Sequence, residues 1–444
     1  MPQYQYLQYI FSDGGFLAQP INGVTTSDGS NLPPPVGGDF NIELVTNPAR
    51  TSYSLPAGYQ VGATFPGGTG KQIDLVAGDV MLNDAGQGDV VVLGTGNDTV
   101  GAGTADTIYG GSGTQVIAGL PSSPGVVIFG GTGQEELIGY RSSITGGSAG
   151  SDTILSSGLD TITGGSGGTD LIESGVGDTV YGGGANDTIL AGYFWNPYVA
   201  SSSGEYITGG TGSEFINGVL GNPTIAGGSA GNEIIWGGSG DLINGGSGAN
   251  VTIGGAPGDT ITGGSGPVFI DASRGNQSIA GGSAGNETIW AGAGDTINGG
   301  GAANETIGGV PSDTITGGTG SEFIDGGQGQ QLITTGSAGF DSIWGGTNDT
   351  FVGGAGGQGL IGFVTTTGAQ AEFFSDSGMT ASNATDSIGG FSQANGDFIL
   401  LNGQSATPVV ASAQTANGNT TINFADGSKL TLLGITSINS SFFH

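Results

Sequence analysis

The chain has 444 residues, of which 98 are Gly, and it carries 37 acidic residues against 5 Lys and Arg, for a formal net charge of −32. This charge excludes nucleic acids and anionic membrane surfaces as partners, because no basic surface is available to neutralise phosphates. No run of about 18 apolar residues is present, so we expect no membrane insertion. Two classes of chain remain, a disordered Gly-rich polymer or a repeat fold that needs Gly at fixed positions.

Residues 1–72 are rich in aromatic side chains and nearly uncharged, with Tyr4, Tyr6, Tyr9, Phe11 and Phe16 close together. We expect a small β-rich region here, which caps the following repeats or serves as an assembly segment. The first 49 residues contain no Lys or Arg, so they lack the charged start of a secretory signal peptide. An export signal is therefore expected elsewhere in the chain.

A period of nine begins at residue 73, where Ile73, Leu82, Val91 and Val100 are evenly spaced. From Ile207 the steps between apolar residues are 9, 9, 10, 8, 10 and 8, and the series then starts again. The six steps sum to 54, which defines super-repeats over residues 207–368 that open at Ile207, Ile261 and Ile315. A disordered chain would not keep such a register, so a repeat fold is indicated.

Each nonapeptide reads as a Gly-rich turn followed by a short strand with one inward apolar residue. Two nonapeptides make one coil, which predicts an all-β fold over residues 73–361, a parallel β-roll or β-solenoid of about 18 residues per coil. Residues 196–206 form a Gly-poor insertion. Because Ile189 and Ile207 keep the spacing of one coil, we expect this insertion to replace one coil without a change of phase.

Several turns resemble the RTX, or hemolysin-type, calcium-binding repeat GGxGxDxUx. The closest are the segments GGTGSEFI, which end at Ile216 and Ile324, and GTGNDTV, which ends at Val100. The resemblance implies a parallel β-roll in which successive turns hold Ca²⁺ through acidic side chains and Gly carbonyls. Turns with Gln115, Gln277 or Gln331 in the acid position have no carboxylate, so calcium is not expected at every turn.

Residues 362–444 are similar to the closing segment of RTX proteins exported by type I secretion. The similarity rests on the spacing of Asp386, Ile388, Asp397 and Ile399, on FADGSKLTLLGI from Phe424, and on a nearly uncharged tail. It implies a C-terminal β region with an uncleaved export signal, recognition by the type I secretion machinery, and a location outside a Gram-negative cell or on its surface.

Acidic residues that occupy equivalent places in successive coils are expected to stack, where like charges about 5 Å apart repel. Such pairs are Asp160 with Asp178, Asp241 with Asp259, and, on the other edge, Glu214 with Glu233 and Glu287 with Glu305. A hard divalent cation would relieve the repulsion, whereas the alternative makes the acids solvated rim residues. The predicted metal ligands are Asp98, Asp106, Asp152, Asp160, Asp170, Asp178, Asp187, Glu214, Asp241, Asp259, Asp295, Asp313, Glu322, Asp341 and Asp349.

Two outward rows are predicted, since the residue after each core Ile points to solvent. Trp236, Trp290 and Trp344 share this position at intervals of one super-repeat and form a candidate interaction row for a glycan or another subunit. A second row contains Thr208, Asn244, Thr262, Asn298 and Thr316, which also suits an ice-binding surface. Repeat duplication with ordinary solvation is the alternative for both rows.

No enzyme is predicted. The sole His is His444, which excludes His-dependent triads and HExxH sites, and the GxSxG pattern recurs only in Gly-rich turns. Our main hypothesis is a secreted, calcium-dependent structural protein that self-associates as a surface layer or biofilm-matrix filament. The alternatives are an extracellular adhesin or binding rod for glycan or ice, and a polysaccharide-acting enzyme that uses paired carboxylates.

Overall fold

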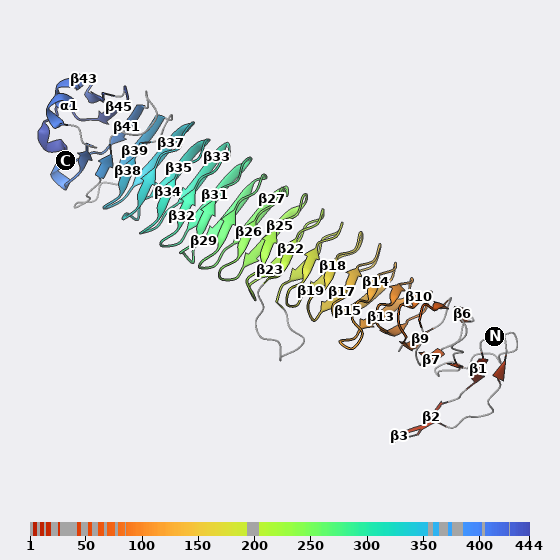
Figure 1. The fold of residues 1–444 in the computed structure, drawn as a ribbon. Coiled ribbons are helices and arrows are strands. Elements are labelled where there is room, and N and C mark those ends of the chain that lie inside the picture. The colour runs from red at the N-terminus through yellow and green to blue at the C-terminus, as the bar shows by residue number, and fades with distance from the viewer. Residues whose placement is uncertain are drawn as a thin grey trace. The chain divides into compact units, whose positions relative to one another are not determined.

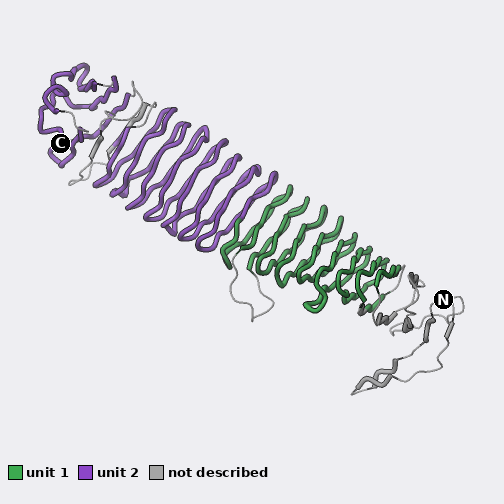
Figure 2. The backbone as a smooth tube through the Cα atoms, viewed as in Figure 1, with its two compact units in different colours: residues 1–224 green, residues 225–444 purple. Residues whose placement is uncertain are grey.

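The computed structural model describes residues 69–75, 79–84, 86–192, 204–353, 358–363, 372–374, 385–401, 405–425 and 427–444, together with the strands assigned before residue 69. The chain forms two compact units, Met1–Thr224 and Ile225–His444, which Figure 2 shows in two colours. In each unit two sheets alternate along the chain, so that between β5 (Ile42–Val45) and β42 (Phe398–Leu400) the odd-numbered strands form one sheet and the even-numbered strands the other (Figure 1). We call them the odd sheet and the even sheet.

In the first unit the odd sheet contains β5 (Ile42–Val45), β7 (Val61–Phe65), β9 (Val80–Asp84), β11 (Thr99–Ala102), β13 (Thr114–Gly119), β15 (Gln134–Gly139), β17 (Thr153–Ser156), β19 (Leu171–Glu173), β21 (Thr188–Leu190) and β23 (Phe215–Gly218). Its even sheet contains β6 (Ser52–Leu55), β8 (Gln72–Leu75), β10 (Val90–Val92), β12 (Thr107–Tyr109), β14 (Val127–Phe129), β16 (Ser143–Thr145), β18 (Thr161–Thr163), β20 (Thr179–Tyr181) and β22 (Tyr206–Thr208). Four short strands precede them, β1 (Gln3–Tyr6), β2 (Tyr9–Ser12), β3 (Gly15–Ala18) and β4 (Thr25–Thr26), and β24 (Thr224–Ala226) lies at the boundary.

In the second unit the odd sheet contains β25 (Asn232–Gly237), β27 (Asn250–Gly254), β29 (Val268–Ala272), β31 (Asn286–Ala291), β33 (Asn304–Gly308), β35 (Ser321–Gly326), β37 (Phe340–Gly345), β39 (Gln358–Phe363), β41 (Thr385–Gly389) and β45 (Lys429–Leu433). Its even sheet contains β26 (Leu242–Asn244), β28 (Thr260–Thr262), β30 (Ser278–Ala280), β32 (Thr296–Asn298), β34 (Thr314–Thr316), β36 (Leu332–Thr334), β38 (Thr350–Val352), β40 (Glu372–Phe374) and β42 (Phe398–Leu400). The unit ends with the 3-10 turn η1 (Gln393–Asn395), helix α1 (Ala406–Ser412), β43 (Gln414–Ala416), β44 (Asn419–Asn423) and η2 (Ser440–Phe442).

The predicted parallel β-solenoid, with two nonapeptides in each coil, is confirmed. Ile144 pairs with Ile162, and Ile289 with Ile307, each on the strand of the next coil. The apolar residues of the nine-residue period point inward and are almost fully buried, as the 0% exposure of Ile162 and Ile307 illustrates. Each coil therefore contributes one residue from each sheet to a thin core, which is buried only by stacking on its neighbours.

The glycines at the turns are required by both backbone angle and space. Gly150 has φ +86° and Gly339 has φ +87°, a conformation that L side chains rarely adopt. A Cβ atom on either residue would also collide with a carbonyl oxygen of the preceding coil, that of Gly133 or Gly320. The high Gly content is therefore explained by close stacking of turn on turn.

The insertion after Ile189 changes the phase of the coil, contrary to the sequence-based expectation. Ile189 pairs with Ile216, and Val180 pairs with Ile207, so each pair spans three nonapeptides instead of two. Ile189 lies in the odd sheet and Ile207 in the even sheet, although their spacing in the sequence is that of one regular coil. One extra nonapeptide is accommodated between them, and residues 193–203 lie outside the described part of the chain. Spacing alone failed here because one nonapeptide shifts the chain from one sheet to the other.

The C-terminal end of the second unit is closed by non-repetitive structure. Strand β45 pairs in parallel with β41 but antiparallel with β44, which in turn pairs antiparallel with β43. In the tail, the Phe442 ring stacks on Phe391 at 5.6 Å, and the backbone N–H of His444 donates to the carbonyl of Ile399. The predicted export signal thus packs against β42 in the folded state, where it pairs with the edge of the even sheet among the described residues.

Candidate metal-binding site

All fifteen predicted acidic ligands point into the coil and are at most 2% exposed, so the alternative of solvated rim residues is wrong. Each lies two residues before a core residue and therefore faces the same side as that residue. We define two columns from them, one at each turn of the coil. The even column, which precedes even strands, contains Asp106, Asp160, Asp178, Asp241, Asp259, Asp295, Asp313 and Asp349. The odd column, whose members lie two residues before the core residue of an odd strand, contains Asp98, Asp152, Asp170, Asp187, Glu214, Glu322 and Asp341.

The even column is a ladder of carboxylates that accept hydrogen bonds from backbone N–H groups. Oδ1 of Asp178 accepts from the N–H of Asp160 at 2.8 Å, one coil earlier, and Oδ2 accepts from Gly175 at 2.7 Å. In the second unit Asp313 makes the same two bonds, to the N–H groups of Asp295 at 2.9 Å and Val310 at 2.8 Å. These acids thus cap backbone donors that would otherwise be buried without acceptors, whether or not a metal is bound.

We expect Asp313→Ala to lower the free energy of unfolding by about 2–4 kcal/mol, because two buried N–H groups lose their acceptor. The matched control is Asp325→Ala, which removes an exposed carboxylate from the same unit and should change the stability by less than about 0.5 kcal/mol. Urea unfolding followed by circular dichroism measures both. Equal effects of the two substitutions would contradict a structural role of the ladder.

The odd column differs from the even column at Glu135, where several hydrogen-bond acceptors lie together with too few hydrogen-bond donors to satisfy them. Oε2 of Glu135 is buried and has no hydrogen-bond partner, whereas both oxygens of Asp152 accept backbone N–H groups. A Cβ atom placed on Gly147 would lie 2.6 Å from the carbonyl oxygen of Gly131 and 3.1 Å from Glu135 Oε2 and Asp152 Oδ2. Three oxygens therefore surround a space that only Gly leaves open.

The same arrangement recurs in the second unit. Both carboxylate oxygens of Glu322 are buried and without a partner. A Cβ atom on Gly336 would lie 2.5 Å from the carbonyl oxygen of Gly318, 2.7 Å from Glu322 Oε2 and 3.3 Å from Asp341 Oδ2. We call these two sets of oxygens the Gly147 trio and the Gly336 trio. Two separate parts of the chain thus build the same set of candidate oxygen ligands, from a Glu, an Asp on the next coil and a Gly carbonyl.

Two further glutamates extend the column beside the Gly336 trio. Glu287, Glu305 and Glu322 are direct partners on β31, β33 and β35, and both oxygens of Glu305 are buried without a partner. Burial, with repulsion from neighbouring acids, raises the pKa of Glu305 to about 8 and that of Glu322 to about 9. Burial likewise raises the pKa of Glu135 to about 8. Each of these sites therefore requires a bound proton or a cation at neutral pH.

This set of oxygen ligands favours a hard cation over a transition metal. The chain has no Cys and one His, and among the described residues no three His, Cys, Asp or Glu side chains converge on one point. Any cation in the trios would therefore have main-chain carbonyl oxygens among its ligands. Carboxylate and carbonyl oxygens in a flexible arrangement are the ligands that Ca²⁺ prefers.

The sequence-based ligand set omitted Glu135, and it left Glu287 and Glu305 as stacked neighbours only. Glu135 lies in the segment QEELI, next to Glu136, so composition alone does not show which of the two glutamates points inward. The signal that identifies the inward residue is its position two residues before a core side chain, here Leu137, which is 0% exposed. The same rule selects Glu287 before Ile289 and Glu305 before Ile307.

The two predicted outward rows lie on different sheets. Trp236, Trp290 and Trp344 are on the odd sheet of the second unit and are 41%, 58% and 55% exposed. In the even sheet of the same unit, Asn244, Thr262, Ala280, Asn298 and Thr316 follow one another in register. The prediction that the Trp side chains point to solvent is confirmed.

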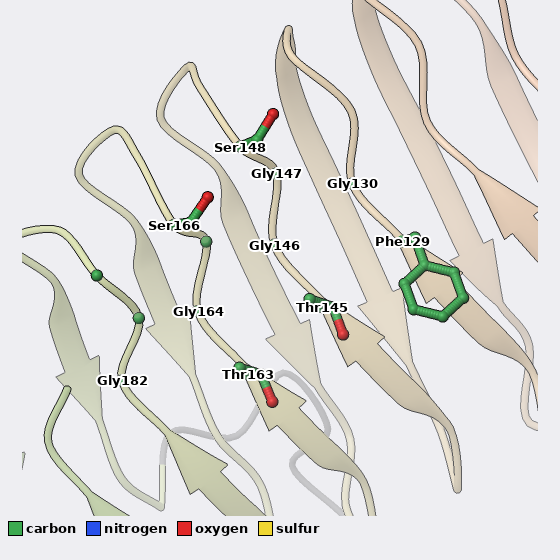
Figure 3. Close-up of a pocket in the computed structure, with 13 residues that line it drawn as sticks. Phe129, Gly130, Thr145, Gly146, Gly147, Ser148, Thr163, Gly164, Ser166 and Gly182 are labelled. Atoms are coloured by element: carbon green, nitrogen blue, oxygen red, sulfur yellow. The ribbon is translucent and has the colours of Figure 1, made fainter. Parts of the chain in front are cut away.

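A groove of about 400 Å³ lies at the turns that follow β14, β16, β18 and β20 in the first unit (Figure 3). Its floor is formed by turn glycines such as Gly146 and Gly164, and Thr145, Thr163 and Ser148 contribute hydroxyl groups to it. Phe129 also lines the groove. None of its lining residues is acidic or basic, so the groove supplies no general acid or base.

Residues 227–256, 253–283 and 335–357 match the family model of the RTX calcium-binding nonapeptide repeat. All three matches lie in the second unit, and the last includes Asp341 of the Gly336 trio. RTX nonapeptide repeats are calcium-binding motifs, so calcium is the ion that these repeats bind. A comparison with curated proteins gives no match. In the described part of the chain, no helix has the length and apolar character needed to cross a membrane.

Proposed function

We propose that this RTX repeat protein is a secreted structural protein, held folded by calcium, that self-associates as a surface layer or biofilm-matrix filament outside a Gram-negative cell. The observation that carries the proposal is the set of buried carboxylate oxygens without a hydrogen-bond partner on Glu135, Glu305 and Glu322. With 37 acidic and 5 basic residues, the chain has too few cationic side chains to compensate them. A bound calcium ion at the Gly147 and Gly336 trios would supply the missing positive charge.

Calcium dependence fits export of an unfolded chain by the type I secretion machinery. Without the ion, repulsion between the stacked acids destabilises the folded coil, so the chain stays unfolded where calcium is scarce. Millimolar calcium outside the cell then drives folding. The C-terminal tail, which packs against β42 in the folded state, would be accessible to the secretion machinery only before this step.

Self-association is supported by what the fold contains. The two units consist of stacked coils, and the described residues include no further domain that could hold a catalytic centre. The closed C-terminal end disfavours growth by coil addition there, which leaves the sheet faces or residues 1–72 as contact surfaces. We propose a non-enzymatic role on this basis.

Negative-stain microscopy of the purified chain tests the proposal. In millimolar CaCl₂ we expect ordered filaments or sheets, and after exchange into EGTA we expect these to disperse. MgCl₂ at the same concentration is the control, because the smaller ion demands a stricter octahedral geometry and should not restore assembly. Monodisperse particles in calcium at every protein concentration would contradict the structural role.

A second function, an extracellular binding rod, is favoured by the exposed Trp row. Three indole rings at more than 40% exposure are unusual for side chains without a partner. Their surroundings indicate the kind of ligand.

A further inference from the structure

The Trp row belongs to a repeating outward pattern on the odd sheet of the second unit. Trp236 pairs with Gly254, Gly254 with Asp271, and Asp271 with Trp290. The next three coils repeat the order through Gly308 and Asp325 to Trp344. We call this column the Trp–Gly–Asp ladder. Its period is three coils, so equivalent indole rings recur about every 14 Å.

Each kind of residue in the ladder has a definite role in shaping the surface. A Cβ atom on Gly254 would lie 2.6 Å from Cε3 of Trp236, so the indole ring lies across the glycine of the next coil. Phe269 and Phe323 meet Trp290 and Trp344 edge to face, with ring centroids 5.6 and 5.8 Å apart. The indole rings are thus braced from the side, while more than half of the surface of Trp290 and Trp344 stays exposed.

The carboxylates of the ladder are held in the same way in both repeats. Oδ1 of Asp271 accepts from the N–H of Ser273 at 3.1 Å, and Oδ1 of Asp325 accepts from the N–H of Gly327 at 3.0 Å. This bond fixes the side chain and leaves Oδ2 to accept a hydrogen bond from a ligand. Each of Trp290 and Trp344 therefore has an oriented acceptor on the coil before it and a side-chain-free glycine on the coil after it.

We propose that the Trp–Gly–Asp ladder binds a neutral polysaccharide chain. A pyranose ring has an apolar face of C–H groups that stacks on an indole, and hydroxyl groups that donate to a carboxylate. The proposal adds a ligand to the structural role and rests on the calcium-folded coil of the proposed function.

Charge argues for a neutral glycan over the other occupants of such a face. The ladder contains Asp271 and Asp325 on a chain of net charge −32, so an anionic glycan would be repelled. A second copy of the same face would bring carboxylates toward carboxylates without a basic residue in the ladder to pair them. A chain of neutral sugars avoids this repulsion, and three aligned platforms bind it more tightly than one by multivalency.

Affinity electrophoresis in gels with calcium and one soluble polysaccharide each tests the proposal. The probes are a β-1,3-glucan, a galactomannan and dextran, with alginate as the anionic comparison. We expect at least one neutral probe to retard the native chain. Trp236→Ala/Trp290→Ala/Trp344→Ala should weaken the retardation at least 100-fold, and Asp271→Asn/Asp325→Asn about tenfold. Tyr206→Ala, which removes an exposed aromatic ring from the even sheet of the first unit, should leave it unchanged.

The outcomes separate this proposal from the structural role. Circular dichroism in calcium should show the same spectrum for the native chain and all variants, because none of the substituted side chains enters the acid columns. Microscopy of the triple Trp variant should still show assemblies. If no neutral probe retards the native chain, or if the triple variant is retarded equally, the ladder does not bind glycan. If that variant instead loses only its assembly, the ladder is an interface between copies and the proposal is wrong.

Discussion

Removal of calcium is expected to unfold most of the solenoid at neutral pH. At a free concentration 1,000 times the dissociation constant, one bound ion stabilises the native state by about 4 kcal/mol. The Gly147 and Gly336 trios together would then contribute about 8 kcal/mol, which is comparable to the whole stability of a typical domain. Circular dichroism during EGTA titration should show loss of β signal, and added CaCl₂ should restore it.

Glutamate-to-glutamine variants connect this effect to the trios. Glu135→Gln/Glu322→Gln should reduce the calcium-dependent rise in melting temperature by at least half, because each trio loses a negative charge at a carboxylate that has at least one buried oxygen without a partner. Without calcium the same variant should melt higher than the native chain above about pH 9, where both native glutamates are ionised and the variant lacks the two buried charges. Asp325→Asn, at an exposed position, is the control and should behave like the native chain. An EGTA-insensitive melt of the native chain, with no metal found by elemental analysis, would refute the calcium role.

Stability without calcium is expected to fall as the pH rises from about 5 to about 9. Burial raises the pKa of Glu135 to about 8 and of Glu322 to about 9, from an ordinary value of 4.5. Between these values the native state binds more protons than the unfolded chain, so the free energy of unfolding decreases with pH. The stabilising contribution is complete below about 4.5 and lost as the pH passes through 8 and 9. With calcium bound, the carboxylates stay charged and the dependence should largely disappear.

Melting temperatures of metal-free protein, compared with those in millimolar CaCl₂ over the same pH range, measure this difference. Calcium binding at pH 7 should also release protons, which a pH indicator detects in weakly buffered solution. Glu135→Gln/Glu322→Gln should release fewer. A metal-free protein whose stability increases between pH 5 and pH 8 would show that these glutamates are already ionised in the native state.

The fold could be predicted because it is defined by a regular spacing of residues along the sequence. A core residue such as Ile162 or Ile307 needs only its own place in a period of nine, and strand alternation then fixes which neighbours face inward. The exposure of Trp290 followed from the same alternation. The phase change after Ile189 could not be predicted, because equal spacing is compatible with either sheet.

The candidate site could be predicted only in part, since inward acids do not all have the same environment. Asp178 and Asp313 reach two backbone N–H groups, whereas Glu305 and Glu322 reach none. The difference depends on the extra methylene of Glu and on turns one residue longer or shorter, which set where the oxygen lies. Sequence spacing identified most of the column but did not separate capped carboxylates from unpartnered ones.

The register of the second unit has a consequence for how such chains change over generations. Ile261, Ile279, Ile297 and Ile315 are successive partners in the even sheet, so residue 315 meets the same surroundings that residue 261 meets. A duplication or deletion of one whole super-repeat would therefore join matching strand ends and keep every column aligned. Recombination between these blocks alters the length of the molecule in steps of three coils without any new packing problem. Natural variants are expected to differ in length by whole super-repeats and to carry one Trp–Gly–Asp triplet more or fewer with each step.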